Sequence, residues 1–161
     1  MTTLTNTTTI MESPVGPLVL CASARGLTRI AFEGEEHDDV LAHPDAGPIV
    51  DAARRELTEY FEGRRRRFDV PVDLGALTAF RRRVLEAAAA IPYGSTVTYR
   101  DLATEVCTPR AVRATGAALG ANPVPIVIPC HRVLRADGGL GGYLAGLEAK
   151  RLLLDLEGAA A

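Results

Sequence analysis

The chain has 161 residues, enough for one or two small domains whose hydrophobic core needs no disulfide or metal to hold it together. Hydrophobic residues make up 47% and charged residues 24%, an ordinary globular composition, and the net charge of −2 does not by itself indicate a nucleic-acid binder. The three cysteines form no Cys-x-x-Cys pair, the threonine-rich start lacks the parts of a secretory signal, and no stretch approaches membrane-spanning length. We therefore expect a cytoplasmic protein without disulfides, metal or a membrane segment.

The first half of the chain predicts a small sheet followed by one helix. The threonine-rich segment Thr2–Thr9 is expected to be a lead-in or an edge strand. Two β-prone runs, Leu18–Ser23 and Leu27–Phe32, flank a short glycine-containing turn and predict a β-hairpin. Apolar residues recur at helical spacing through Ile49–Glu62, and Gly63 follows as a C-terminal stop, so this segment predicts an amphipathic helix.

The segment after that helix links two predicted lobes. The run Arg64–Arg67 is interpreted as a solvated turn, as most charge runs are, and Phe68–Val72 is a candidate for one more strand. We place the boundary between the lobes at Leu74–Ala76. The predicted organisation is an N-terminal domain over residues 1–76 and a C-terminal domain over residues 77–161.

Three helices are predicted at the start of the C-terminal domain. Thr78–Ile91 has the apolar spacing of an amphipathic helix. Thr98 and Asp101 have the spacing of a capping box and predict a helix that runs to about Val106. A further helix is predicted over Thr108–Gly120, with threonine as N-cap and proline as the first helical residue. Two short helices joined by a tight turn indicate a helix-turn-helix.

The second helix of this pair has an unusual surface. Its residues Val112, Gly116 and Leu119 lie at helical spacing and are expected to face inward. Two arginines share another face with small residues, namely Arg110, Arg113, Ala114 and Ala117. Such a face can approach phosphates closely but offers few groups that read base edges, which favours backbone-dominated binding in the DNA minor groove. The alternative is an alanine-rich helix that packs against another lobe and carries two solvated arginines.

The stretch Pro125–Val133 places a thiol and an imidazole directly after an apolar run. Ile126–Ile128 is β-branched and too short for a helix, and Pro129 cannot continue a strand, so the run predicts a buried strand that ends there. Cys130 then lies at the edge of a core with His131 beside it, an arrangement that can supply a thiolate nucleophile. The alternative is that Cys130 is only a small buried hydrophobic residue.

The C-terminal segment predicts a glycine-rich loop and a final helix. The glycines of residues 137–142 allow the backbone to come close to a ligand. The segment Leu147–Glu157 predicts a helix. Glu157 stands in its last turn, where the helix dipole disfavours a carboxylate, so Glu157 is either solvated or paired with a group such as His131.

The predicted elements give an α/β (α+β) fold, and their motifs resemble those of a known family. The stretch Pro129–Val133 is similar to the acceptor motif of the O6-alkylguanine-DNA alkyltransferases, also called methylated-DNA–protein-cysteine methyltransferases. Further matching motifs are Pro92-Tyr93-Gly94, Thr98-Tyr99, Arg110–Arg113, Asn122–Pro125, Gly142-Tyr143, Gly146-Leu147, Lys150 and Leu156–Gly158. The resemblance is continuous from about Phe80 to Gly158 and looser before it.

The resemblance implies a ribonuclease-H-like N-terminal lobe and a helical C-terminal lobe with a helix-turn-helix. It implies DNA repair by direct, irreversible, single-turnover transfer of the methyl or other alkyl group to Cys130. The substrates would be O6-methylguanine and O4-methylthymine in double-stranded DNA, flipped out of the helix because the reacting oxygen is otherwise engaged in pairing. It implies no cofactor and no metal, and we expect a monomer, with cooperative binding along DNA left open.

The resemblance also assigns roles to individual residues. His131, linked to Glu157, would relay the thiol proton through a water and so raise the thiolate fraction of Cys130. Asn122 would brace the turn that carries the nucleophile. The alkyl pocket would be formed by four residues, Tyr143, Leu144, Val133 and Lys150.

On the DNA side, the resemblance implies two residues that act on the duplex. Arg113 would fill the space left by the flipped base, and Tyr99 would crowd the adjacent phosphate and help to rotate the nucleotide outward. The helix face that carries them would contribute the remaining DNA contacts, Arg110, Ala114 and Ala117.

Some positions depart from the family pattern, and two rival functions stay open. Leu85 and Leu152 stand where the family often has tryptophan, Gly141 replaces a common polar residue, and Leu144 is bulkier than usual, so the size range of the alkyl group is not predicted. One rival is a sensor that flips the lesion without transfer, although such relatives lack the cysteine. The other is a thiol hydrolase built on Cys130, which would turn over repeatedly.

Overall fold

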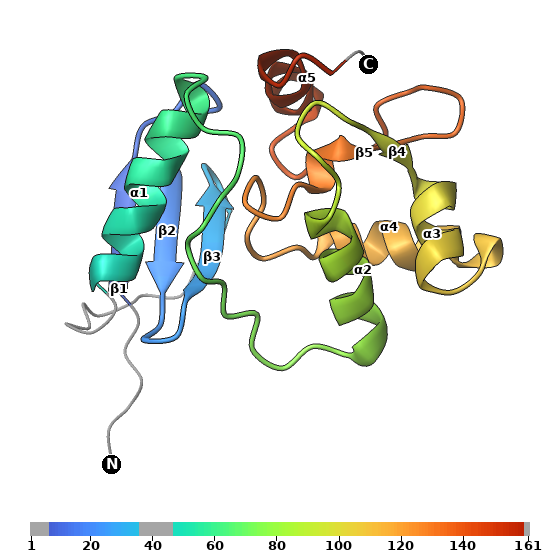
Figure 1. Cartoon of the computed structure of the whole chain (residues 1–161), viewed down its shortest axis with the longest axis horizontal. Helices are drawn as coiled ribbons and strands as arrows, with labels where there is room; N and C mark the ends of the chain where they lie inside the picture. Colours follow the sequence, from blue (N-terminus) through green and yellow to red (C-terminus); the bar gives the residue numbers. More distant parts are fainter. Residues whose placement is uncertain (1–6, 36–46, 160–161) are drawn as a thin grey trace. The chain divides into compact units, whose positions relative to one another are not determined.

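The computed structural model describes residues 7–35 and 47–159, which divide into two compact units between Gly75 and Ala76 (Figure 1). The first unit holds a sheet and one helix, and the second is mainly helical. No helix within the described ranges is long and apolar enough to cross a membrane. Residues 2–6 of the predicted lead-in lie outside the described part of the chain.

The sheet of the first unit is antiparallel, with its strands in the order β1-β2-β3. The strands are β1 Thr7–Met11, β2 Leu18–Ala22 and β3 Leu27–Phe32. The predicted edge strand and hairpin are therefore confirmed. Between β2 and β3, Gly26 lies so close to the segment after α1 that a Cβ there would be 2.8 Å from the Pro71 carbonyl oxygen, so only glycine fits.

Helix α1, Gly47–Phe61, packs against this sheet, and its confirmed apolar face includes Val50, Ala53 and Leu57 (Figure 1). The helix ends as predicted, because Gly63 takes a positive φ of 77°. The same buried face carries one charged residue, Glu56, which the apolar pattern does not predict.

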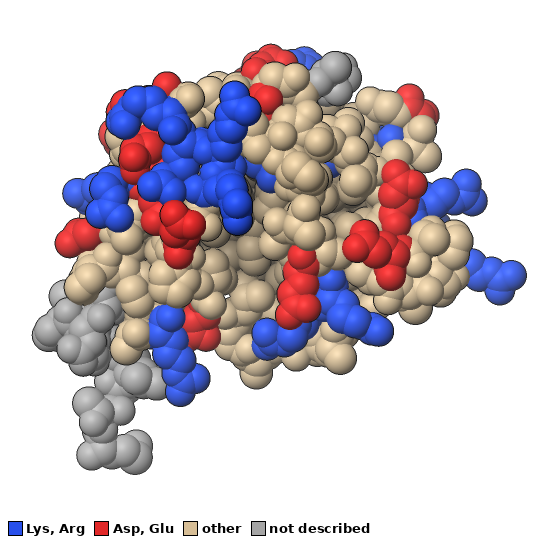
Figure 2. Space-filling model, viewed as in Figure 1, with Lys and Arg blue, Asp and Glu red and all other residues tan. Residues whose placement is uncertain are grey.

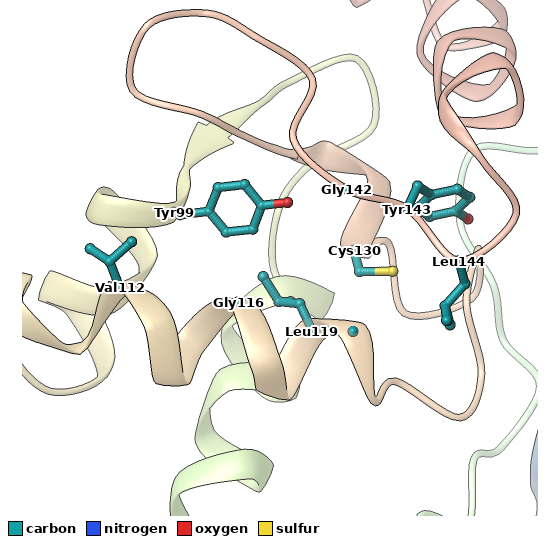
Figure 3. Close-up of a pocket in the computed structure, with 9 residues that line it drawn as sticks. Tyr99, Val112, Gly116, Leu119, Cys130, Gly142, Tyr143 and Leu144 are labelled. Atoms are coloured by element: carbon teal, nitrogen blue, oxygen red, sulfur yellow. The ribbon is translucent and has the colours of Figure 1, made fainter.

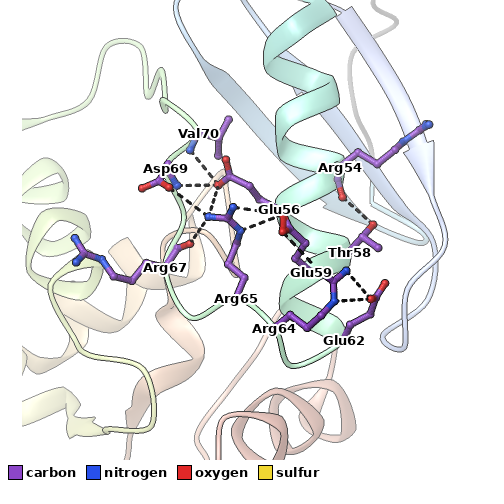
Figure 4. Close-up of polar contacts among 10 residues, drawn as sticks. All are labelled: Arg54, Glu56, Thr58, Glu59, Glu62, Arg64, Arg65, Arg67, Asp69 and Val70. Carbon is purple, nitrogen blue, oxygen red and sulfur yellow. Dashed lines mark hydrogen bonds and ion pairs between the residues drawn. The ribbon is translucent and has the colours of Figure 1, made fainter.

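The interpretation of Arg64–Arg67 as a solvated turn is wrong for Arg65. Its guanidinium donates to Glu59 at 3.4 Å and to Asp69 at 3.3 Å, and only 22% of its side chain is exposed (Figure 4). Figure 2 shows Lys and Arg gathered near the C-terminal end of α1, with Asp and Glu among them. The acidic residues that neutralise the run lie outside it, which is why the run alone misleads.

The strand suggested over Phe68–Val72 is also wrong. The segment forms a single parallel bridge, between Val72 and Leu27, and is otherwise irregular. Two of its amides, those of Asp69 and Val70, donate to the Glu56 carboxylate in place of a strand ladder.

The second unit contains the predicted helix pair. Its helical segments are α2 Ala79–Ala89, α3 Tyr99–Val106, the 3₁₀ turn η2 Pro109–Ala111, α4 Val112–Gly120, the 3₁₀ turn η3 Cys130–Arg132 and α5 Leu147–Leu156. The capping box is confirmed, because the Thr98 hydroxyl accepts from the Asp101 amide at 3.0 Å and the Asp101 carboxylate accepts from the Thr98 amide at 3.1 Å. Thr108 caps the 3₁₀ turn, so α4 begins later than predicted.

The inward face of α4 differs from the prediction. Its buried residues are Thr115, Ala118 and Leu119, whereas Val112 is 36% exposed. Val112 and Gly116 line a pocket and do not enter the core. The helix is therefore rotated relative to the face that apolar spacing alone selects.

A short parallel ladder brings two distant segments of the second unit together. Strand β4, Val97–Thr98, pairs with β5, Val133–Leu134. Tyr99 follows β4 directly, and Cys130–Arg132 precedes β5 directly. The ladder therefore places the start of α3 beside the segment that carries the thiol.

The strand predicted over Ile126–Ile128 is wrong. Ile126 has a positive φ of 74°, and the segment is a turn that carries one isolated bridge between Pro125 and Ile128. Asn122 organises the turn, since its carbonyl oxygen accepts from the Val124 amide at 3.0 Å and its amide group donates to the Ile128 carbonyl at 2.9 Å. These side-chain hydrogen bonds replace the strand ladder, so the β-branched pattern fails here.

Candidate active site

A pocket of about 480 Å³ opens in the second unit, within the usual range of roughly 300–1,000 Å³ for ligand pockets. One wall is the α4 face of Val112, Gly116 and Leu119 (Figure 3). Tyr99, Tyr143 and Leu144 complete much of the lining, and Cys130 lies between the two tyrosines (Figure 3). The lining is mostly apolar, so the sulfur is the chemically distinctive group that faces this space.

Cys130 is the first residue of η3, and its surroundings control its protonation. The residue is only 7% exposed, and this burial raises the pKa of the Cys130 thiol. A hydrogen bond from the Asn122 side chain and the positive charge of Lys150 oppose this rise without overcoming it. The resting sulfur is therefore a thiol at neutral pH, and a reaction must remove its proton.

His131 and Glu157 meet in the interior of the second unit. The His131 Nε2 and Glu157 Oε2 atoms are 2.8 Å apart, and both side chains are fully buried. Burial lowers the pKa of His131 despite the carboxylate, so the imidazole is neutral at pH 7. Its other ring nitrogen, Nδ1, is buried and has no hydrogen-bond partner among the described residues. A neutral imidazole with one unoccupied nitrogen can accept a proton.

Arg132 is the charged residue of the site that sequence reasoning missed. Its Nε donates to Glu157 Oε1 at 2.8 Å, and one terminal nitrogen donates to Glu157 Oε2 at 2.9 Å. Its other terminal nitrogen donates to the Ile91 carbonyl at 2.6 Å. The sequence signal for Arg132 was its position within the Pro129–Val133 motif. The motif does not indicate which residues Arg132 would bind.

Lys150 is a fully buried cation on α5 that holds the loop beside the pocket. Its ammonium donates to the carbonyl oxygens of Val133 at 2.8 Å and Gly142 at 3.2 Å, and also to that of Leu140. The Tyr99 hydroxyl lies 3.5 Å from the same nitrogen. Burial lowers the pKa of Lys150 to about 8. Of the four predicted pocket residues, Tyr143 and Leu144 line the pocket, whereas Lys150 and Val133 do not and instead hold the backbone beside it.

The predicted DNA-facing residues share an exposed surface. Arg110, on η2, and Arg113, Ala114 and Ala117, on α4, are all exposed. They lie apart from the buried His131–Glu157 pair, so the structure separates an outer basic face from an inner polar network. Within the described residues, no three His, Cys, Asp or Glu side chains gather closely enough to hold a metal ion.

Comparison with known proteins agrees with this geometry over almost the whole chain. Residues 79–159 match the family model described as "6-O-methylguanine DNA methyltransferase, DNA binding domain". Residues 6–74 match its partner, described as "6-O-methylguanine DNA methyltransferase, ribonuclease-like domain". The chain belongs to the 6-O-methylguanine DNA methyltransferase family.

Relatives within this family are similar over most of their length. A methylated-DNA–protein-cysteine methyltransferase of Methanosarcina barkeri is 40% identical over 150 residues, which is 92% of this chain and 94% of the relative. The one of Mycobacterium bovis is 41% identical over 149 residues, 91% of this chain and 89% of the relative. The crystal structure of Mycobacterium tuberculosis OGT in complex with DNA superposes with a TM-score of 0.84 at 39% identity and covers 94% of each chain. The predicted family and fold class are thus confirmed.

Three departures from the 6-O-methylguanine DNA methyltransferase pattern have a structural setting here. Gly141 has a positive φ of 72°, and a Cβ there would lie 2.9 Å from the Tyr99 ring, so the close approach of the tyrosine requires glycine. Leu144 lines the pocket while 48% of it remains exposed. Leu85 is buried in the core, and its replacement of tryptophan does not affect the pocket lining.

Proposed function

We propose that this chain repairs alkylated DNA by transferring the methyl group of O6-methylguanine, and of O4-methylthymine, to the Cys130 sulfur. The observation that supports this most directly is that Cys130 faces a 480 Å³ pocket while the next residue, His131, forms a buried pair with Glu157. Family membership supports the same reaction. The transfer is irreversible and occurs once per molecule, because the product is a thioether that no group of the site can hydrolyse.

The reaction is a displacement at the alkyl carbon. The Cys130 sulfur forms a bond to that carbon while the bond from carbon to guanine O6 breaks, and the electron pair stays with the base. The thiol proton passes through a water to His131, and the departing base gains one proton, so the sum is thiol plus alkylated base to thioether plus free base. Burial raises the pKa of Tyr99 and keeps its hydroxyl protonated, so it can donate to the base as negative charge develops.

Access to the pocket requires that the damaged nucleotide leave the duplex, at a cost of a few kcal/mol that is smaller for a poorly paired base. Arg113 would occupy the space of the departed base, while Tyr99 would press on the adjacent phosphate. The small residues Ala114 and Ala117 let α4 approach the backbone, and Arg110 adds a phosphate contact. The partner is double-stranded DNA that carries O6-alkylguanine, bound by a monomer, with Asn122 bracing the turn that carries the nucleophile.

Mass spectrometry after mixing with an O6-methylguanine duplex tests this function. One added methyl group on the peptide that contains Cys130 is expected, with none in Cys130→Ala. The exposed Cys107 serves as an internal control, since its peptide should stay unmodified. Unmodified Cys130 with tight lesion binding would instead indicate a sensor, and repeated product release from one molecule would indicate a thiol hydrolase.

A further inference from the structure

The turn Ile91–Gly94 contains the matching motif Pro92-Tyr93-Gly94, yet none of its residues lines the pocket. It packs against the C-terminal end of α5, where Glu157 lies. The Tyr93 hydroxyl donates to the Leu156 carbonyl at 3.2 Å, and a Cβ on Gly94 would lie 3.3 Å from the Glu157 carbonyl oxygen. The motif therefore secures the end of the helix that carries the carboxylate.

Arg132 connects this turn to the carboxylate. Its guanidinium carbon lies 5.7 Å from the centre of the Tyr93 ring, and its bond to the Ile91 carbonyl fixes one edge of the group. The remaining edge faces Glu157 and donates to both carboxylate oxygens. The planar guanidinium is thus held on three sides, and a lysine ammonium could not reproduce these directions.

The hydrogen-bond directions determine where the His131 proton lies. Arginine only donates, so both Glu157 oxygens accept, and the charge of the two-pronged guanidinium favours the ionised, unprotonated carboxylate. The His131 Nε2 atom, 2.8 Å from Oε2, must then be the donor in that contact. A neutral His131 therefore carries its proton on Nε2 and leaves Nδ1 as the acceptor.

We infer that Arg132 is a positioning residue for the transfer: by holding Glu157 with both oxygens as acceptors, it fixes the His131 tautomer whose Nδ1 receives the Cys130 proton. This inference rests on the proposed function for its kinetic consequence, but the tautomer itself is a property of the unreacted protein. The buried and unpartnered Nδ1 supports it independently. In the other tautomer, Nδ1 would carry a buried N–H group without an acceptor, and the unprotonated Nε2 would lie against the Glu157 carboxylate, which also only accepts.

A purely structural ion pair is the alternative. Buried pairs commonly stabilise a fold without any part in chemistry. The charged groups that act on His131 are Glu157, Arg132 and Lys150, and the Tyr143 ring centre lies 6.5 Å away. Burial, then Arg132 and Lys150, lower the pKa of His131, while Glu157 raises it. Removing the Arg132 charge must therefore raise the pKa of His131, an effect that a structural brace elsewhere would not produce.

Nitrogen NMR of the unmodified protein labelled with ¹⁵N-histidine tests the tautomer without any variant. The inference expects a protonated Nε2 and an unprotonated Nδ1 for His131 near pH 7, assigned by comparison with His131→Gln. A protonated Nδ1 would overturn it. Because this measurement needs no DNA, its result stands whether or not the chain transfers a methyl group.

Single-turnover kinetics with the O6-methylguanine duplex test the positioning role. In Arg132→Met we expect one methyl per folded molecule, a rate constant at least ~10-fold lower, and an acid limb of the rate–pH profile moved to higher pH. Arg132→Lys keeps the charge but not the fork and should be slowed less, which preserves the test if the methionine variant folds poorly. Arg135→Met is the matched control, because Arg135 pairs with Asp137 at the surface, with 62% of each side chain exposed.

A double variant separates the two explanations. If Arg132 acts through Glu157, Arg132→Met should slow Glu157→Gln much less than it slows the unmodified protein. Equal slowing in both backgrounds, or a lowered melting temperature with an unchanged rate and pH profile, would show that Arg132 is only structural. Failure of the unmodified protein to transfer at all would count against the proposed function and leave the tautomer result intact.

Discussion

Among the described residues, each of the two units buries one glutamate, and the two carboxylates are satisfied by different kinds of donor. Glu56, on α1, is 3% exposed and accepts from the amides of Asp69 at 2.7 Å and Val70 at 3.1 Å, with Arg65 further away at 3.9 Å (Figure 4). Glu157 is 5% exposed and accepts from the side chains of Arg132 and His131.

The difference shows that burial alone does not mark a functional carboxylate. Any buried carboxylate needs strong donors, because its removal from water is costly. Backbone amides, as at Glu56, cannot titrate, so that carboxylate can only fix the path of the chain. A histidine donor can gain or lose a proton, so the environment of Glu157 can take part in chemistry.

The largest expected effect on this comparison comes from Glu157→Gln. The variant should lose the anion that orients His131, so we expect the rate of methyl transfer to fall about 10²-fold or more. The free energy of unfolding should fall by about 3–5 kcal/mol, because Arg132 would remain buried without its counter-charge. Single-turnover kinetics and urea unfolding measure the two effects.

An unchanged transfer rate in a folded Glu157→Gln protein would contradict the claim that Glu157, unlike Glu56, takes part in the chemistry. Burst amplitude provides the control, since it counts the folded molecules that can accept a methyl group. A full amplitude with a slow rate separates lost chemistry from lost folding.

Glu56→Gln is the matched change in the other unit, and a smaller effect is expected. Both backbone amides donate to the same oxygen, Oε1, which glutamine retains, so the variant loses only the negative charge of that acceptor, at a cost of about 1–2 kcal/mol of unfolding free energy. The transfer rate should stay within about twofold, because no donor to Glu56 belongs to the site. A large fall in rate at full burst amplitude would show that the first unit controls the chemistry and that the two carboxylates are not distinct in kind.

The same contrast explains what could be predicted from the sequence. The capping box of Thr98 and Asp101 and the β2–β3 hairpin depend on residues close in sequence, and both were predicted. The strand over Ile126–Ile128 failed because hydrogen bonds from Asn122 override the local β preference. A side-chain donor outside the run cannot be read from the run itself.

The candidate site divides in the same way. Cys130 and His131 were identified from a local motif whose chemistry is explicit in the residue types. Arg132 was missed because its partners, Ile91 and Glu157, are brought to it only by the packing of the turn after α2 and the end of α5. The backbone donors to Glu56 were missed for the same reason, since the amides of Asp69 and Val70 belong to a segment without regular structure.

The smallest expected effect is a pH dependence of the unfolding free energy that comes from His131 beside Glu157 and has no counterpart beside Glu56. Burial lowers the pKa of His131 below its unfolded value of about 6.5, so the unfolded chain binds more protons as the pH falls through that value. The contribution of His131 to the free energy of unfolding should therefore be constant above about pH 7 and fall below about 6.5, by at most about 1.4 kcal/mol per pH unit for this one proton. Urea unfolding from pH 8 to pH 5 should show this slope in the unmodified protein and in Glu56→Gln, and a shallower slope in His131→Gln. Identical slopes in all three proteins would mean that His131 has the same pKa in the folded and unfolded states, so no pH-dependent stability would distinguish the surroundings of Glu157 from those of Glu56.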